Sequence, residues 1–182
     1  MKFNMFDELM NSLGGLDTQK MIEMLTPKFK FALREDLKDV KQFLPTRATD
    51  KSSGWDVSCA WEDHKNHAIQ PGEFVKIPLG IRCIPDEGYW YEVKPRSSTF
   101  VKKHLHALYG TVDNDYRDQL YFCAQYTGIS PLTLEFGSRI GQIIPVKLQE
   151  MTVEEISNAD YEKFCKEEAN NRTGGFGSSG DK

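Results

Sequence analysis

Short stretches in which apolar and polar residues alternate recur along most of the chain and predict a mainly β protein. The first is Phe29–Leu33, and the later ones are Asp56–Trp61, Glu73–Ile77, Ile81–Ile84, Trp90–Lys94, Leu105–Tyr109, Leu120–Tyr126, Leu132–Phe136 and Gln142–Val146. Turn residues separate them, as in Pro71-Gly72 and Pro85–Gly88. Many short strands at this spacing are typical of a sandwich or barrel of jelly-roll type.

Helical periodicity is confined to the two ends of the chain. Phe6, Leu9, Met10 and Leu13 recur at helical spacing, and a second helix capped by Asp17 or Thr18 would end before Pro27. A late helix is expected over Asn158–Ala169, with Tyr161, Phe164 and Cys165 on one face. We therefore predict four parts: residues 1–27 as a helical extension, 28–150 as the β body, 151–171 as a connecting segment with a helix, and 172–182 as a flexible glycine-rich arm.

Composition narrows the class of protein without naming a reaction. The chain has 182 residues, 39% of them hydrophobic and 27% charged, which suits one domain with a sizeable core. A net charge of −4 argues against direct nucleic-acid binding, and no apolar run is long enough to span a membrane. The four cysteines include no Cys-x-x-Cys pair, which favours a cytoplasmic protein. The pairs His64/His67 and His104/His106 lack further ligands, so we expect no zinc site.

The stretch Tyr109–Leu120 is the strongest candidate for chemistry. Asn114 and Asp115 favour a tight turn, because these residues tolerate left-handed backbone and bond to their own main chain. With apolar flanks on both sides, the stretch predicts a β-hairpin with Asp113 and Tyr116 at its bend. Taken alone, it is explained equally well as an exposed acidic turn or as a catalytic one.

Four further stretches carry side chains suited to an anionic ligand. In Lys94–Thr99, Arg96 offers a planar fork of donors followed by hydroxyls, and a helix over Thr99–His104 would add favourable partial charge. In Arg172–Gly180, glycines would let backbone amides cradle phosphates. The remaining two are Ser52–Val57, which carries Asp56, and Gly137–Pro145, which carries Arg139 and Gln142. Each is explained by itself as a polar loop, turn or linker.

In their order and spacing, the five stretches together resemble the five motifs of the trimeric dUTPase family (dUTP nucleotidohydrolases, or dUTP diphosphatases), from about Phe29 to Gly180. The most specific pieces read Pro-Arg-Ser-Ser, Val-Asp-Asn-Asp-Tyr-Arg and Gly-Gly-Phe-Gly-Ser-Ser-Gly. The resemblance implies a mainly β, dUTPase-type jelly-roll or β-clip body that hydrolyses dUTP to dUMP and pyrophosphate with Mg²⁺. It also implies a homotrimer in which several chains assemble each active site, and it is compatible with a viral or phage source acting in the host cytoplasm.

The resemblance also implies roles for individual residues. Asp113 matches the base that activates the water attacking the α-phosphorus, and Asp56 matches the acid that holds the metal through its water shell. Tyr116 matches the ring that lies against the deoxyribose and excludes a 2′-hydroxyl, and Arg139 matches an ion-pair partner. The other matches are substrate-binding positions: Arg96, Ser97, Ser98 and Gln142 for phosphates, Thr111, Val112 and Tyr121 for the uracil edge, and Arg172, Phe176, Gly177, Ser178 and Ser179 in the closing arm.

Three positions depart from the family pattern. Asp118 stands where glycine usually follows Tyr-Arg, and Ala107 stands where an asparagine often contacts the base, with His106 beside it as a substitute. Asn171 occupies the usual place of the arm's arginine, so we expect Arg172 to make that contact through the slack of the arm.

Two other functions are compatible with parts of the sequence. A dCTP deaminase, or a bifunctional deaminase–dUTPase, shares the arginine-serine-serine site but needs a glutamate soon after the hairpin turn. Asp118–Cys123 contains no glutamate, and Thr133-Leu134-Glu135 lies far downstream. A nucleotide-responsive regulatory protein would use residues 1–25 to dock a protein partner. The missing glutamate argues against deamination, whereas the presence of all five motifs indicates that catalysis is retained and leaves a second, regulatory role open.

Overall fold

A computed structural model describes residues 18–108 and 110–167. Its helices are α2 (Thr18–Leu25), α3 (Ser97–Val101) and α4 (Asn158–Glu167), with short 3-10 turns at Glu35–Leu37 and Lys41–Phe43. Its strands are β1 (Phe29–Leu33), β2 (Trp55–Ser58), β3 (His67–Ile69), β4 (Phe74–Pro78), β5 (Ile81–Pro85), β6 (Tyr89–Pro95), β7 (Leu105–Ala107), β8 (Gly110–Val112), β9 (Tyr121–Tyr126), β10 (Leu132–Leu134) and β11 (Arg139–Lys147).

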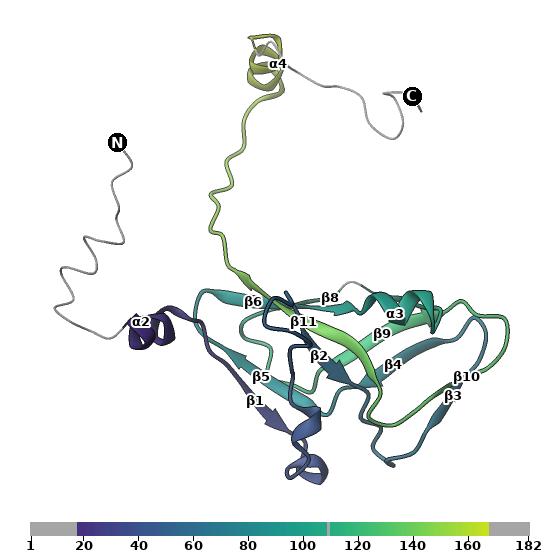
Figure 1. Ribbon diagram of the computed structural model, residues 1–182. Helices are drawn as coiled ribbons and strands as arrows, with labels where there is room; N and C mark the ends of the chain where they lie inside the picture. The colour runs from purple at the N-terminus through teal and green to yellow at the C-terminus, as the bar shows by residue number, and fades with distance from the viewer. Residues whose placement is uncertain (1–17, 109, 168–182) are drawn as a thin grey trace. The chain divides into compact units, whose positions relative to one another are not determined.

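The strands form antiparallel sheets around a common core (Figure 1). A four-stranded sheet has the order β2-β11-β6-β8, and a three-stranded sheet has the order β4-β9-β7. Two strand pairs, β1-β5 and β10-β3, complete the arrangement. Inward-facing side chains of these sheets, among them Ile77, Tyr91 and Phe122, build one apolar cluster. The alternation of buried and exposed residues along β5 and β9 is what one face packed on a core produces.

The predicted hairpin is wrong in one respect. β7 does pair with β9, with Leu105 opposite Tyr126, but Gly110–Val112 leaves that sheet and pairs with β6, with Val112 opposite Tyr91. The chain therefore crosses from one sheet to the other between Ala107 and Gly110. Periodicity indicates which face of a strand is buried but not which strand is its partner, so the crossing could not be anticipated.

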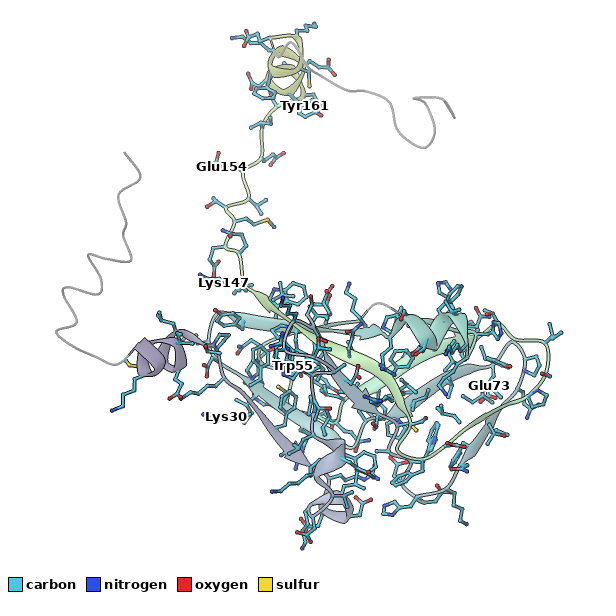
Figure 2. All side chains as sticks on the ribbon, viewed as in Figure 1. Lys30, Trp55, Glu73, Lys147, Glu154 and Tyr161 are labelled. Atoms are coloured by element: carbon cyan, nitrogen blue, oxygen red, sulfur yellow. The ribbon has the colours of Figure 1, made fainter. Side chains whose placement is uncertain are left out.

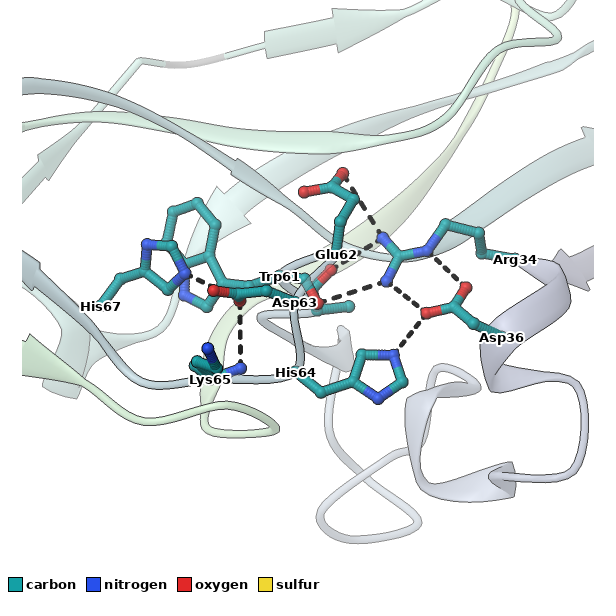
Figure 3. A network of polar contacts seen from close by, with 9 residues as sticks. Arg34, Asp36, Trp61, Glu62, Asp63, His64, Lys65 and His67 are labelled. Carbon is teal, nitrogen blue, oxygen red and sulfur yellow. Dashed lines mark hydrogen bonds and ion pairs between the residues drawn. The ribbon is translucent and has the colours of Figure 1, made fainter.

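The body also contains a polar network that joins its first 3-10 turn to the loop after β2 (Figure 3). The Arg34 guanidinium donates to both oxygens of Asp36, at 2.6 and 2.8 Å, and to the carbonyl of Ala60 at 2.8 Å. The ring of His64 lies 2.5 Å from Asp36 and stacks on Phe136. Because Arg34 makes these hydrogen bonds, it holds the pKa of the Asp36 carboxyl well below its usual range.

Of the second unit of the chain, residues 149–167 are described, and they are considered by themselves. Lys147 ends β11, Glu154 lies in the segment without regular structure that follows, and Tyr161 lies on α4 (Figure 2). The backbone N–H of Asp160 donates to Ser157 Oγ at 3.1 Å, the side-chain cap that a helix start requires. The expected late helix is confirmed up to Glu167. The first predicted helix and the arm lie outside the described residues.

Candidate functional site

Asp56 is the centre of a charged cluster that joins three of the predicted motifs. The residue lies on β2 and is buried, and its backbone exchanges hydrogen bonds of 2.7 and 3.2 Å with Thr46. Its carboxylate forms an ion pair with Arg96 Nε at 2.9 Å and accepts a hydrogen bond from Arg139 Nη1 at 3.2 Å. Two cationic side chains thus converge on one buried acid, at the end of the sheet where β2, β11 and β6 lie side by side.

Gln142 belongs to the same cluster. It is opposite Asp56 on β2 and opposite Lys94 on β6, and its Nε2 donates to the carbonyl of Pro95 at 3.0 Å. Gly54 packs directly against it, because a Cβ built on that glycine would lie 2.2 Å from Gln142 Oε1. Because glycine has no side chain, position 54 leaves room for the side chain of Gln142.

α3 brings the two predicted serines to the start of a helix. Its first residues are Ser97 and Ser98, preceded by Arg96, so the helix begins two residues earlier than the predicted Thr99–His104. Thr99 is fully buried, and its hydroxyl donates to the carbonyl of Ile140 at 2.6 Å. Thr99 thereby attaches α3 to β11 at the point where the register of β11 shifts against β2. Periodicity over so short a helix carries too little signal to place its start.

A separate cavity of about 260 Å³ lies beside the loop that follows β8. Its lining includes five predicted site residues, Thr111, Val112, Asp113, Tyr116 and Tyr121. The Tyr116 hydroxyl donates to the carbonyl of Gln119 at 3.1 Å, which fixes the ring beside Asp113. The predicted base and the predicted sugar-facing ring therefore share one cavity.

The loop itself has a different geometry from the expected left-handed turn. Its bend is closed by a hydrogen bond of 3.2 Å from the backbone N–H of Tyr116 to the carbonyl of Asp113. Within the described residues, positive φ angles outside glycine occur only at His64 and His104. Neither Asn114 nor Asp115 therefore adopts the left-handed backbone that was expected. Asn114 instead acts through its side chain.

The Asp56 cluster and the Asp113 cavity lie towards opposite ends of β6. Val112 is opposite Tyr91, whereas Arg96 follows Pro95, at the far end of the same strand. At about 3.3 Å per residue, Tyr91 and Arg96 are roughly 17 Å apart. Over the ranges 18–108 and 110–167, no hydrogen bond or ion pair joins Asp113 to Asp56, Arg96 or Gln142. The predicted site residues of one chain therefore fall into two separate groups.

The departures from the family pattern have visible consequences. Asp118 Oδ1 accepts from the backbone N–H of Gln119 at 2.6 Å and so closes the far side of the loop. Ala107 is buried, while His106 lines a different cavity, of about 500 Å³, and meets Phe100 edge to face. His106 therefore does not replace the missing asparagine in the Asp113 cavity. Asn171 and the arm residues Arg172, Phe176, Gly177, Ser178 and Ser179 lie outside the described residues.

Two residues at the site were not predicted. Lys76 on β4 lines the Asp113 cavity and places its ammonium 3.8 Å from the centre of the Tyr121 ring. Gly54 shapes the space of Gln142. The contact of Gly54 could have been suspected from a glycine immediately before a strand, whereas no sequence signal marks Lys76.

The described residues contain neither a cluster of metal ligands nor a membrane-spanning helix. No group of three or more His, Cys, Asp and Glu side chains there could hold a metal ion. No helix among those residues is long and apolar enough to cross a bilayer. Of the predicted docking residues 1–25, α2 is described, and its Ile22, Met24 and Leu25 are exposed.

Comparisons with known proteins point to one family. A family model described as dUTPase matches residues 41–180. A deoxyuridine 5'-triphosphate nucleotidohydrolase from Wolbachia pipientis subsp. Culex pipiens is 36% identical over 139 residues, covering 75% of this chain and 86% of that protein. The protein of the same name from Aquifex aeolicus is 38% identical over 112 residues, covering 60% of this chain and 73% of that protein.

Solved structures confirm the expected fold. The dUTPase of phage phi11 of S. aureus superposes with a TM-score of 0.63 at 16% identity, covering 72% of this chain and 97% of that one. The dUTPase of Streptococcus mutans gives a TM-score of 0.60 at 24% identity, covering 68% and 98%. With the family model spanning well over half of the residues, the chain belongs to the dUTPase family.

Proposed function

We propose that this chain, a dUTPase that hydrolyses dUTP, does so by in-line attack of a water that Asp113 orients and deprotonates at the α-phosphorus. The observation that carries the proposal is the single cavity lined by Asp113, Tyr116 and the strand Thr111–Val112. A carboxylate can accept a proton from a water that is positioned beside it. The products are dUMP and pyrophosphate.

The same cavity would also select the nucleoside. Main-chain groups of Thr111, Val112 and Tyr121 would pair with the edge of uracil, and a cytosine there would leave buried polar groups unpaired. The Tyr116 ring, fixed by its hydroxyl, would lie against the sugar and leave no room for a 2′-hydroxyl. Phe176 of the arm would stack over the base.

The Asp56 cluster is proposed to bind the phosphates. Arg96 offers a charge-assisted fork, Ser97 and Ser98 offer hydroxyls, and Gln142 lies across the sheet from Asp56. An incoming triphosphate would compete with Asp56 for the two arginines. The arm residues Arg172, Gly177, Ser178 and Ser179 would then close over the phosphates and exclude water.

A magnesium ion fits this arrangement only as a partner of the substrate. Asp56 is the one acid in the cluster, and both its oxygens already face arginines, so the chain offers no direct ligand set. Mg²⁺ keeps several waters when phosphates ligate it, which suits an outer-sphere contact with Asp56 once the arginines turn to the phosphates. A solved dUTPase of phage phi11 is described with a structural Mg(II) ion. When bound, the ion would neutralise charge on the phosphate oxygens.

The separation of the Asp56 cluster from the Asp113 cavity supports assembly of the site from several copies. The roughly 17 Å of main chain between Tyr91 and Arg96 along β6 favours a base and phosphate ligands that come from different chains. A homotrimer in which each site takes its base from one chain and its phosphate ligands from another would provide this arrangement.

Deamination of dCTP is not favoured by the structure. Glu135, the only glutamate in a Thr-Leu-Glu run, follows β10 and does not line the Asp113 cavity. Its carbonyl instead accepts from the Cys59 thiol at 2.8 Å.

The decisive experiment measures pyrophosphate release from dUTP, UTP, dTTP and dCTP, with and without Mg²⁺. We expect rapid pyrophosphate release from dUTP but not from the other three nucleotides, and a strongly reduced rate when Mg²⁺ is absent. Asp113→Asn should lose at least about a hundredfold in kcat, since general base catalysis contributes that much. An Asp113→Asn protein with near-wild-type turnover would refute the mechanism, and ammonia release from dCTP would favour the deaminase instead.

A further inference from the structure

Asn114, the residue directly after Asp113, reaches across to a turn far away in the sequence. Its side-chain nitrogen donates to the carbonyl of Asp86 at 2.9 Å and to the carbonyl of Tyr89 at 2.7 Å. Both hydrogens of the amide nitrogen are thus used, which neither a carboxylate nor a hydroxyl could reproduce. The two carbonyls belong to the turn between β5 and β6.

That turn is itself held on two sides. Asp86 exchanges two hydrogen bonds with Lys28: its backbone N–H donates to the Lys28 carbonyl at 2.9 Å, and its Oδ2 accepts from the Lys28 N–H at 2.7 Å. On the other side, the Leu148 N–H donates to the carbonyl of Gly88 at 2.8 Å. The turn is therefore fixed by the segment that enters β1 and by the segment that leaves β11, and it offers Asn114 a rigid support.

The loop that carries Asp113 depends on this support. The pairing of β8 with β6 ends at Val112, and the loop's next hydrogen bonds to the rest of the body are those of Asn114. Asp113 is exposed, and within the described residues its carboxylate accepts no hydrogen bond. The main chain at 113–114 therefore sets the position from which the carboxylate extends into the cavity.

We propose that Asn114 is a positioning residue for dUTP hydrolysis, which fixes the backbone that aims Asp113 at the attacking water. The proposal rests on the proposed function, in which Asp113 is the base. In this role Asn114 acts through the two carbonyls that its amide binds at the β5–β6 turn, rather than by contact with the reacting groups. Displacing a reacting group by about 1 Å can cost about a hundredfold in rate, so loss of the support should lower kcat more than it weakens binding.

The test compares Asn114→Ala, Asn114→Asp and Asn114→Ser with a matched asparagine elsewhere. Asn66 also joins a loop to remote backbone, since its Oδ1 accepts from the Phe136 N–H at 2.9 Å, but it lies away from the Asp113 cavity. In the full-length protein, Asn114→Ala should lower kcat for dUTP by about 10- to 100-fold, with KM changed by less than about threefold. Asn114→Asp should be as impaired or worse, because its carboxylate faces two carbonyls. Asn66→Ala should keep near-wild-type kcat.

The outcomes separate this proposal from the one on which it rests. Asn114→Ser keeps one donor and should fall between wild type and Asn114→Ala, so it decides the matter if the other two variants do not fold. Wild-type kcat in a folded Asn114 variant, or a rise in KM with kcat unchanged, would overturn the positioning role. If Asp113→Asn, measured in parallel, stays active, the proposed mechanism itself has failed.

Discussion

Thr99→Val isolates one hydrogen bond that attaches the phosphate-binding helix to the sheet. Valine has nearly the same shape as threonine, so the change removes the hydroxyl that donates to Ile140 at 2.6 Å while filling the same buried space. Ile140 lies at the register shift between Arg139 and Gly141, outside the pairing of β11 with β2 and β6. Its buried carbonyl would lose this partner, at a cost of about 1–3 kcal/mol.

Thr99→Ser is the matched control, because it keeps the hydroxyl and removes one methyl group, at about 1 kcal/mol. For a chain of this length, about 2 kcal/mol corresponds to a fall in melting temperature of roughly 4–8 °C. Unfolding in urea, followed by tryptophan fluorescence at one fixed protein concentration, measures the difference. We expect Val to be more destabilising than Ser and to lower dUTP turnover, since Ser97 and Ser98 move with α3. Equal stability of Thr99→Val and wild type would refute the assigned role of the hydroxyl.

Three further changes test other parts of the structure. Gly54→Ala should displace the Gln142 amide, whose oxygen would lie 2.2 Å from the new Cβ, and should lower kcat about tenfold with little change in melting temperature; unchanged kcat would contradict the tight fit. In Asp36→Asn, stability against unfolding by urea should fall less steeply than in wild type as the pH is lowered. Because the pKa of Asp36 is lowered in the folded protein, its ionised form adds stability above the unfolded pKa of about 4, and this stability is lost as the pH falls towards the folded pKa. If the stability of the variant falls as steeply with pH as that of wild type, Asp36 does not have this role. Burial raises the pKa of the Cys83 thiol to about 11, so alkylation at pH 8, mapped by mass spectrometry, should spare Cys83 until the protein is unfolded.

The strands of the body were predictable because their alternation is a local property. Phe29–Leu33 and Ile81–Ile84 were expected as strands, and the structure has them as β1 and as β5, which ends one residue later at Pro85. The motif residues were predictable for a different reason, since their residue types and spacing resemble a known family. Five of them line one cavity, and Asp56, Arg96 and Gln142 form one cluster.

What could not be predicted is the choice of partners across the fold. The crossing between Ala107 and Gly110 depends on which strand edge offers hydrogen bonds, and no local pattern encodes it. Asn114 was interpreted as a turn former, a role that its residue type suggests, whereas its amide bonds a turn 25 and 28 residues away. Such contacts depend on the assembled sheets and become visible only in three dimensions.

The separation of the Asp56 cluster from the Asp113 cavity along β6 has a genetic consequence. An Asp113→Asn chain and an Arg96→Ala chain are each expected to be inactive alone, because each lacks one proposed site residue in every copy. If sites form between copies, random mixing of the two chains gives about one quarter of sites an intact base from one chain and an intact arginine from the other. Two dead genes expressed together would then restore activity, which no protein with a self-contained active site could do.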